Sequence, residues 1–174
     1  MTLSVLVVGV GNILLGDEGV GIHAIRELDR RFQFPENVTL TDGGTAGLLL
    51  MGEILQAEKV LILDAIRSGN PTGTVVRLDG TALGSALQGK LSPHELGLGD
   101  ILSAARLQGF DAEVVVLGIE PERIELGLTL SATVASAVPR WIEAALDELR
   151  RWGVHAFERD RDCGRESARC TSYR

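Results

Sequence analysis

Three continuous apolar runs rich in β-branched residues constrain the fold of this chain more than any other feature. They are SVLVVGV (residues 4–10), KVLILDAI (59–66) and EVVVLGIEP (113–121). Strands without an apolar–polar alternation are typical of a parallel sheet whose two faces are both covered. The chain must therefore place other elements on both sides of this sheet.

Helical periodicity in the remaining sequence supplies those elements. Apolar residues recur at helical spacing in residues 18–32, in 43–56, in 92–109 and in a stretch that begins near Ser131, a plausible N-cap. Pro139 lies inside the last pattern, and we expect it to kink or split that helix. The alternation of strands and helices predicts an α/β sandwich with a mostly parallel sheet.

Two shorter segments predict further strands, NVTLTD (37–42) and GTVVRLDG (73–80). The second follows the run at 59–66 after SGNPTG, a turn with the composition of a hairpin. Because this turn is too short for a crossover helix, we expect residues 73–80 to run antiparallel to residues 59–66.

Length, composition and charge limit the classes of protein. A chain of 174 residues, 45% of them hydrophobic, can bury the core of one domain. Its net charge of −7 argues against nucleic acid and anionic membranes as partners and favours a cation or a basic segment. No apolar stretch approaches the roughly 20 residues that cross a bilayer, and the N-terminus lacks the positive region of a signal peptide. We therefore expect a cytosolic protein.

The domain is expected to end before the C-terminus. We predict an α/β domain over residues 1–152 and a polar, mobile tail over residues 153–174, where the apolar periodicity stops and arginines are frequent. Cys163 and Cys170, the only cysteines, lie in this tail. Two tail cysteines do not make a disulfide framework, which agrees with a cytosolic location.

Acidic residues follow the predicted strands at their carboxyl ends. The first strand leads to Asp17 and Glu18, the strand at 37–42 ends at Asp42, and the run at 59–66 delivers Asp64. Sites in such sheets form where the carboxyl ends of the strands meet. Like charges gathered at one edge need a cation or a proton, so this edge is the candidate site.

His94 adds a nitrogen to this set. Ser92, Pro93 and Glu95 form a capping box with proline at the first helical position, so His94 falls in the first turn of a helix. A neutral imidazole beside two carboxylates is a natural metal ligand.

Each of these residues also has a simpler interpretation. Glu18 could be an acid that favours a helix start, and Asp42 and Asp64 could be turn residues. His94 could be a solvated residue of a first helical turn. The functional interpretation is favoured because all four converge on one edge of the sheet.

The glycine-rich segment GVGNILLGDEGVG (9–21) invites a nucleotide-binding interpretation. A dinucleotide fingerprint would need glycine at position 14, where this chain has Leu14, and no Walker lysine follows. Asp17 and Glu18 would also repel a phosphate. The glycines are better explained as allowing the backbone to fold closely around an ion or an extended peptide.

Several of these stretches together resemble the hydrogenase maturation endopeptidases, which process the large subunit of nickel–iron hydrogenases. The matching stretches are GVGNILLGDEGVG, DGGTAG, VLILDAI, SPHELGL and GIEPERIELGLTLS, and they occur in the order of the family. The resemblance covers about residues 4–150. It implies a single α/β domain, a three-layer sandwich with a five-stranded twisted sheet between helices.

The resemblance also implies roles for individual residues. The metal-binding positions of the family fall on Glu18, Asp64 and His94, and Asp42 matches a position tied to substrate recognition and processing. The metal is nickel, delivered by the substrate. The implied activity is removal of a short C-terminal extension from the nickel-loaded precursor of a hydrogenase large subunit, by a protein expected to be a monomer.

Two questions stay open at the level of sequence. The scissile bond could be hydrolysed with help from the metal, or a free carboxylate could act as general base, with Asp42 as first candidate and Asp17 as second. The family is classed with aspartic peptidases, yet the chain has no paired DTG motifs. The alternative function is a non-catalytic nickel-binding chaperone or sensor with the same ligands.

Overall fold

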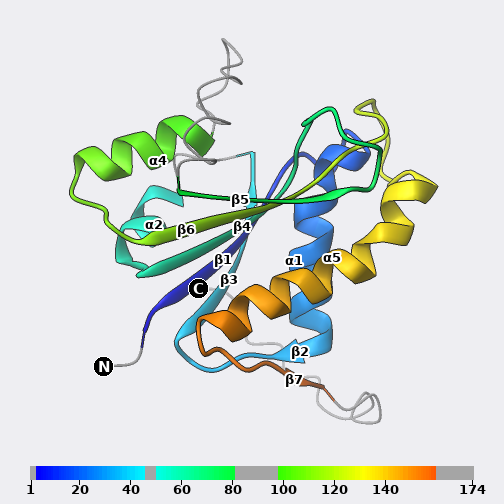
Figure 1. Cartoon of the computed structure of the whole chain (residues 1–174). Helices are drawn as coiled ribbons and strands as arrows, with labels where there is room; N and C mark the ends of the chain where they lie inside the picture. Colours follow the sequence, from blue (N-terminus) through cyan, green and yellow to red (C-terminus); the bar gives the residue numbers. More distant parts are fainter. Residues whose placement is uncertain (1–2, 46–49, 81–97, 160–174) are drawn as a thin grey trace, which may run out of the picture.

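A computed structural model describes residues 3–45, 50–80 and 98–159 of the chain (Figure 1). One five-stranded sheet forms its centre, with strand order β3-β1-β4-β6-β5. Its strands are β1 (Val5–Val10), β3 (Val38–Gly44), β4 (Lys59–Ala65), β5 (Val75–Asp79) and β6 (Glu113–Ile119). All pairings are parallel except β5 with β6, as the sequence predicts for a mostly parallel sheet with one antiparallel strand.

Helices cover both faces of this sheet (Figure 1). One face carries α1 (Val20–Arg31) and α5 (Ala132–Arg151), and the other carries α2 (Met51–Gln56) and α4 (Leu98–Leu107). A 3₁₀ turn, η1 (Asp17–Gly19), leads directly into α1. The predicted three-layer α/β sandwich is confirmed.

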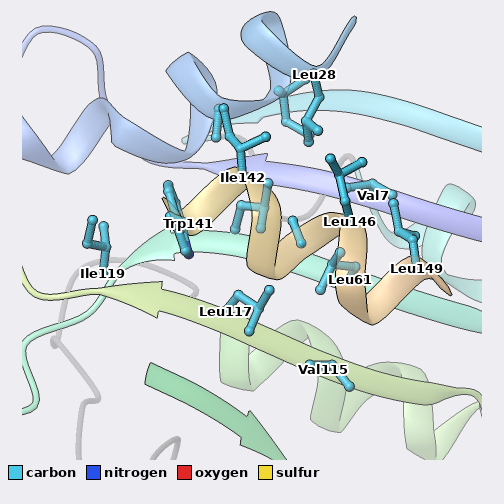
Figure 2. Close-up of a cluster of buried hydrophobic side chains, with 14 of the residues drawn as sticks. Val7, Leu28, Leu61, Val115, Leu117, Ile119, Trp141, Ile142, Leu146 and Leu149 are labelled. Carbon is cyan, nitrogen blue, oxygen red and sulfur yellow. The ribbon is translucent and has the colours of Figure 1, made fainter. Parts of the chain in front are cut away.

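The apolar runs divide their side chains between two cores. In β1, Val5 and Val7 lie in the core under α1 and α5, whereas Leu6 and Val8 lie in the core under α2 and α4. Figure 2 shows the first core, where Trp141 and its neighbours on α5 face the strands. Successive strand residues point to opposite faces, so a strand buried on both faces needs an unbroken apolar run.

The strand at 73–80 runs in the expected direction, but the predicted hairpin is wrong. Strand β5 does not pair with β4, because β6 lies between them. The connecting loop passes over the end of β6 and is bonded to it on both sides. Ile66 N–H donates to the carbonyl of Ile119 (2.9 Å), and Glu120 N–H donates to the carbonyl of Thr74 (2.9 Å). The hairpin-like composition of the turn did not specify the neighbouring strand.

Two predicted helices differ from the structure in detail. Gly43 and Gly44, expected to begin a helix, belong to β3, and the described helix begins at Met51. Ser131 caps α5 as predicted, accepting a hydrogen bond from Val134 N–H (3.3 Å). Helix α5 is not split at Pro139 but continues through it.

The expected tail boundary at Gly153 lies too early in the chain. Val154 is buried in the core, and the short strand β7 (Phe157–Glu158) pairs antiparallel with β2 (Phe32–Gln33). Arg159 N–H also donates to the carbonyl of Arg31 (2.8 Å). Residues 153–159 therefore pack against the domain, although they show no apolar periodicity. The cysteines at 163 and 170 lie outside the described residues.

We searched the helices of the described ranges for a membrane-spanning segment. No helix there is both long and apolar enough to span a bilayer.

Candidate active site

The start of α1 packs directly on the carboxyl ends of two strands. A β-carbon at Gly21 would overlap the carbonyl oxygens of Leu63 in β4 and Val10 in β1, so only glycine allows this approach. Glu18 lies in the 3₁₀ turn just before this contact, and Asp64 follows Leu63. Both carboxylates thus belong to the same edge of the sheet, and both are partly buried.

The glycine-rich turn between β1 and α1 is folded tightly on itself. Gly11 has a φ of 136°, and a β-carbon there would overlap the carbonyl oxygen of Glu18. The sequence favours a role in which these glycines let the backbone fold around an ion or a peptide. In the structure, Gly11 lets the backbone of the turn pack against itself and fixes the position of Glu18.

Asp17 is fully buried and accepts four hydrogen bonds from one segment. Its Oδ1 accepts from Ser131 N–H (2.7 Å). Its Oδ2 accepts from the N–H groups of Glu122 (2.9 Å) and Arg123 (3.1 Å) and from the Ser131 hydroxyl (2.9 Å). Burial alone would raise the pKa of Asp17, but these hydrogen bonds outweigh it and hold the pKa below its ordinary value. A carboxylate has about four acceptor sites, so those of Asp17 are filled.

Asp42 is held differently, at the carboxyl end of the edge strand β3. Its carboxylate forms an ion pair with Arg26 of α1 (3.1 Å) and accepts a hydrogen bond from Gly44 N–H (3.2 Å). Its side chain is 43% exposed. Two of about four acceptor sites are used, which leaves room for a water molecule.

The strand register places Asp42 and Asp64 on either side of the end of β1. Gly9 of β1 is opposite Asp42 in β3 and opposite Leu63 in β4. The strands that carry Asp42 and Asp64 are therefore separated by two strand spacings of about 4.8 Å each. Asp42 is level with Leu63, so the side chain of Asp64, one residue further along, leaves the sheet on the opposite face.

Asp64 is followed by a loop that a second buried carboxylate holds. Glu120, 7% exposed, lies just beyond the end of β6. Its Oε2 accepts hydrogen bonds from the N–H (2.8 Å) and hydroxyl (2.6 Å) of Ser68 and from Asn70 N–H (3.3 Å). Burial alone would raise the pKa of Glu120, but these donors hold the pKa below its ordinary value.

The predicted metal ligands are only partly described. His94 and its capping box of Ser92, Pro93 and Glu95 lie outside the described residues. Within the described ranges, no group of three or more His, Cys, Asp or Glu side chains is arranged to hold a metal ion. The three-ligand site formed by Glu18, Asp64 and His94 therefore stays a prediction.

Sequence reasoning missed two residues at this edge. Glu120 follows a buried apolar strand in the same way as Asp64, so the rule that identified Asp64 could have found it. Arg26, the ion-pair partner of Asp42, left no comparable signal, because an arginine on the polar side of a helix is ordinary.

Comparison with known proteins identifies the family. The profile of the hydrogenase maturation protease family matches residues 22–148. The chain is 39% identical over 160 residues to the hydrogenase 2 maturation protease of Escherichia coli strain K12, a match that covers 91% of this chain and 98% of that protein. The chain belongs to the hydrogenase maturation protease family.

Further similarities extend this result to the fold. The chain is 40% identical over 152 residues to the hydrogenase expression/formation protein HoxM of Cupriavidus necator, covering 86% of this chain and 75% of that one. The structure of the hydrogenase maturating endopeptidase HybD from E. coli superposes with a TM-score of 0.85 at 38% identity, covering 90% of this chain and 98% of that chain. The protein is thus an endopeptidase, a hydrolase, on the fold that the sequence predicts.

Proposed function

We propose that this protease removes a short C-terminal extension from the nickel-loaded precursor of a nickel–iron hydrogenase large subunit in the cytoplasm. The family supplies the class of reaction. One observation supports placing the active site at this edge of the sheet. Gly21 contacts the ends of β1 and β4, and this contact brings Glu18 and the end of the strand that carries Asp64 to one edge. We further propose that the protease acts as a monomer.

The donor set suits a divalent transition metal. Glu18 and Asp64 offer two carboxylates, and His94 would add an imidazole nitrogen. Two oxygens and one nitrogen leave coordination positions open, which a metal already bound by the substrate can fill. Nickel held there would mark the precursor as loaded and would act as a Lewis acid near the scissile bond.

Asp42 is the better candidate for the general base. A general base must accept a proton from water, and Asp42 is exposed and has acceptor sites left. Asp17 is completely buried, and its four acceptor sites are filled. We therefore assign the proton transfer to Asp42 and a holding role to Asp17.

The reaction then needs one water molecule. Asp42 takes a proton from this water as its oxygen forms a bond to the scissile carbonyl carbon. The carbon–nitrogen bond breaks when Asp42 passes this proton to the departing amine, and the products are a new carboxyl terminus and the released extension. Arg26 keeps the Asp42 carboxylate in place by its ion pair.

Mass spectrometry of the precursor tests this proposal. Incubation with nickel-loaded precursor should yield a large subunit shortened at its C-terminus, and incubation with nickel-free precursor should yield none. A non-catalytic nickel chaperone or sensor would bind the loaded precursor and leave its mass unchanged, which would contradict the proposal.

A further inference from the structure

Residues 120–131, hereafter the brace, connect the two loops that carry the predicted carboxylate ligands. The brace begins at the end of β6 and ends at the N-cap of α5. In Figure 1 this segment (yellow-green) lies with the loop before β5 and the turn before α1 at one end of the sheet. Hydrogen bonds join it to both.

The first contact of the brace holds the loop that follows Asp64. Glu120 binds Ser68 and Asn70 through its side chain. Its backbone carbonyl also accepts a hydrogen bond from Gly73 N–H (2.8 Å). The chain that leaves β4 at Ala65 is thus fixed to the brace within a few residues of Asp64.

The second contact holds the turn that carries Glu18. The brace donates four hydrogen bonds to Asp17, the residue before Glu18. Its backbone adds a short ladder, in which Gly16 N–H donates to the carbonyl of Gly127 (2.8 Å) and Gly127 N–H donates to the carbonyl of Leu14 (2.9 Å).

The donors to both carboxylates are neutral N–H and O–H groups. Hydrogen bonds to an ionised acceptor are shorter and stronger than neutral ones, and a buried carboxylate that loses its donors is strongly penalised. Asp17 and Glu120 therefore resist any movement of the brace relative to the two loops. Ser131 strengthens one end, since its hydroxyl donates to Asp17 and accepts from Val134 N–H.

We propose that Asp17 and Glu120 are positioning residues. They clamp the brace and thereby hold the carboxylates of Glu18 and Asp64 in the positions needed to bind the same divalent ion. This inference rests on the metal site of the proposed function. Neither residue touches the ion in this account; each acts through the backbone of the neighbouring ligand. Outer partners of this kind typically contribute about 10- to 100-fold to metal affinity.

Titration with Ni²⁺ alone, followed by calorimetry, tests the proposal. The parent protein is the full chain with Cys163→Ser and Cys170→Ser, which removes thiols that would compete for a soft or borderline metal. Asp17→Asn keeps the shape of the side chain but replaces one acceptor oxygen by a donor, so it cannot accept all four hydrogen bonds. We expect its Kd for Ni²⁺ to rise by about 10- to 100-fold at a temperature where it is folded.

Glu148→Gln is the matched control. Glu148 is 3% exposed and accepts hydrogen bonds from Arg77 (2.9 Å) and Arg151 (3.0 Å), near the C-terminal end of α5 and far along the chain from the brace contacts. Its loss should lower the melting temperature while leaving the Kd for Ni²⁺ unchanged. A merely structural role of Asp17 would make the two variants behave alike.

The outcomes separate the brace from the metal site itself. If Asp17→Asn binds Ni²⁺ as the parent does, the positioning role is overturned. If Asp17→Asn does not fold, Glu120→Gln provides the same test from the other clamp. If the parent binds no Ni²⁺, or Glu18→Gln binds as tightly as the parent, the proposed metal site fails, and the brace proposal falls with it.

Discussion

Asp17 and Glu120 at the carboxyl end of the sheet are held in a different way from Glu148 and Glu113 toward its amino end. At the carboxyl end, Asp17 and Glu120 are bound by neutral N–H and O–H groups of loops. At the amino end, Glu148 is paired with Arg77 (2.9 Å), and Glu113 is paired with Lys59. Neutral donors satisfy a carboxylate without cancelling its charge. Asp17 and Glu120 therefore keep negative charge that can attract a cation, whereas the charges of Glu148 and Glu113 are cancelled by their partners.

The arginines near these carboxylates show the same difference. Arg123 contributes its backbone N–H to Asp17, but its guanidinium is paired with Glu125 (3.4 Å) and not with Asp17. At the amino end Arg77 bridges Glu148 and Asp79 (2.5 Å), and these two carboxylates hold the pKa of its guanidinium above the ordinary value. Asp17 and Glu120, which are bound by neutral donors, lie at the end of the sheet that the family motifs mark.

The largest expected effect is loss of processing when a predicted ligand is removed. His94→Ala should abolish cleavage of the nickel-loaded precursor, because two carboxylates alone make a poorer site for a borderline metal. Its stability should change by no more than about 0.5 kcal/mol, as for an ordinary surface substitution. Glu18→Gln and Asp64→Asn should behave alike without additive defects. Cleavage at the normal rate by folded His94→Ala protein would refute the site.

A loss of about 10²- to 10⁴-fold in the cleavage rate is expected for Asp42→Asn, the range typical of a missing general base. The amide can keep the hydrogen bond from Gly44 but cannot take a proton from water. Single-turnover cleavage followed by mass spectrometry measures this, with Ni²⁺ affinity as the control that should not change. If the rate stays within a few-fold of wild type, the proton is taken elsewhere.

A methyl group added where α1 packs on the carboxyl ends of the strands should also lower the stability of the protein. Gly21→Ala should cost about 3 kcal/mol, the upper part of the range for overpacking, since the new methyl group meets two backbone carbonyls that cannot rotate away. Gly52→Ala in α2 is the control, because nothing lies within 4 Å of its added β-carbon. It should instead stabilise by up to about 1 kcal/mol. Chemical denaturation distinguishes the two, and equal effects would contradict the close approach of α1.

The smallest expected effect is a difference in acid sensitivity. The pKa of Glu120 is lowered in the folded protein, so the stability from its ionised form is complete above its unfolded pKa of about 4.3 and is lost as the pH falls through its folded pKa. Glu120→Gln should be less stable than wild type at neutral pH, with a difference that shrinks below about pH 4. Thermal melts across this range would show it, and a constant difference would rule out the charged form as the stabilising species.

The core of the fold was predictable because burial dictates sequence directly. A strand such as β1, covered on both faces, can only be written as a continuous apolar run. The neighbour of β5 was not predictable, because the choice depends on backbone groups of Glu120 and Thr74 that every residue carries. Docking of residues 153–159 was missed for a similar reason, since most of its contacts are backbone pairing and surface ion pairs.

The sequence predicts that these acids lie at one edge of the sheet, but not how each of them is held. Acids at strand ends identified the edge through Asp42 and Asp64, and the same rule extends to Glu120. Nothing in the sequence distinguishes Asp17 from Glu18 as a buried holding residue, because its four donors come from a segment more than a hundred residues later. Roles of this kind depend on tertiary contacts.

A crystal structure of the protein with Ni²⁺, measured at the nickel absorption edge, tests the central claim most directly. We expect one anomalous peak at the carboxyl end of the sheet, about 2.0–2.2 Å from a carboxylate oxygen of Glu18, one of Asp64 and an imidazole nitrogen of His94, the distances usual for such ligands of a divalent metal. The same map should show Asp17 and Glu120 still bound to the brace and not to the ion. A peak at another place, or Glu18 and Asp64 on separate faces, would contradict the account.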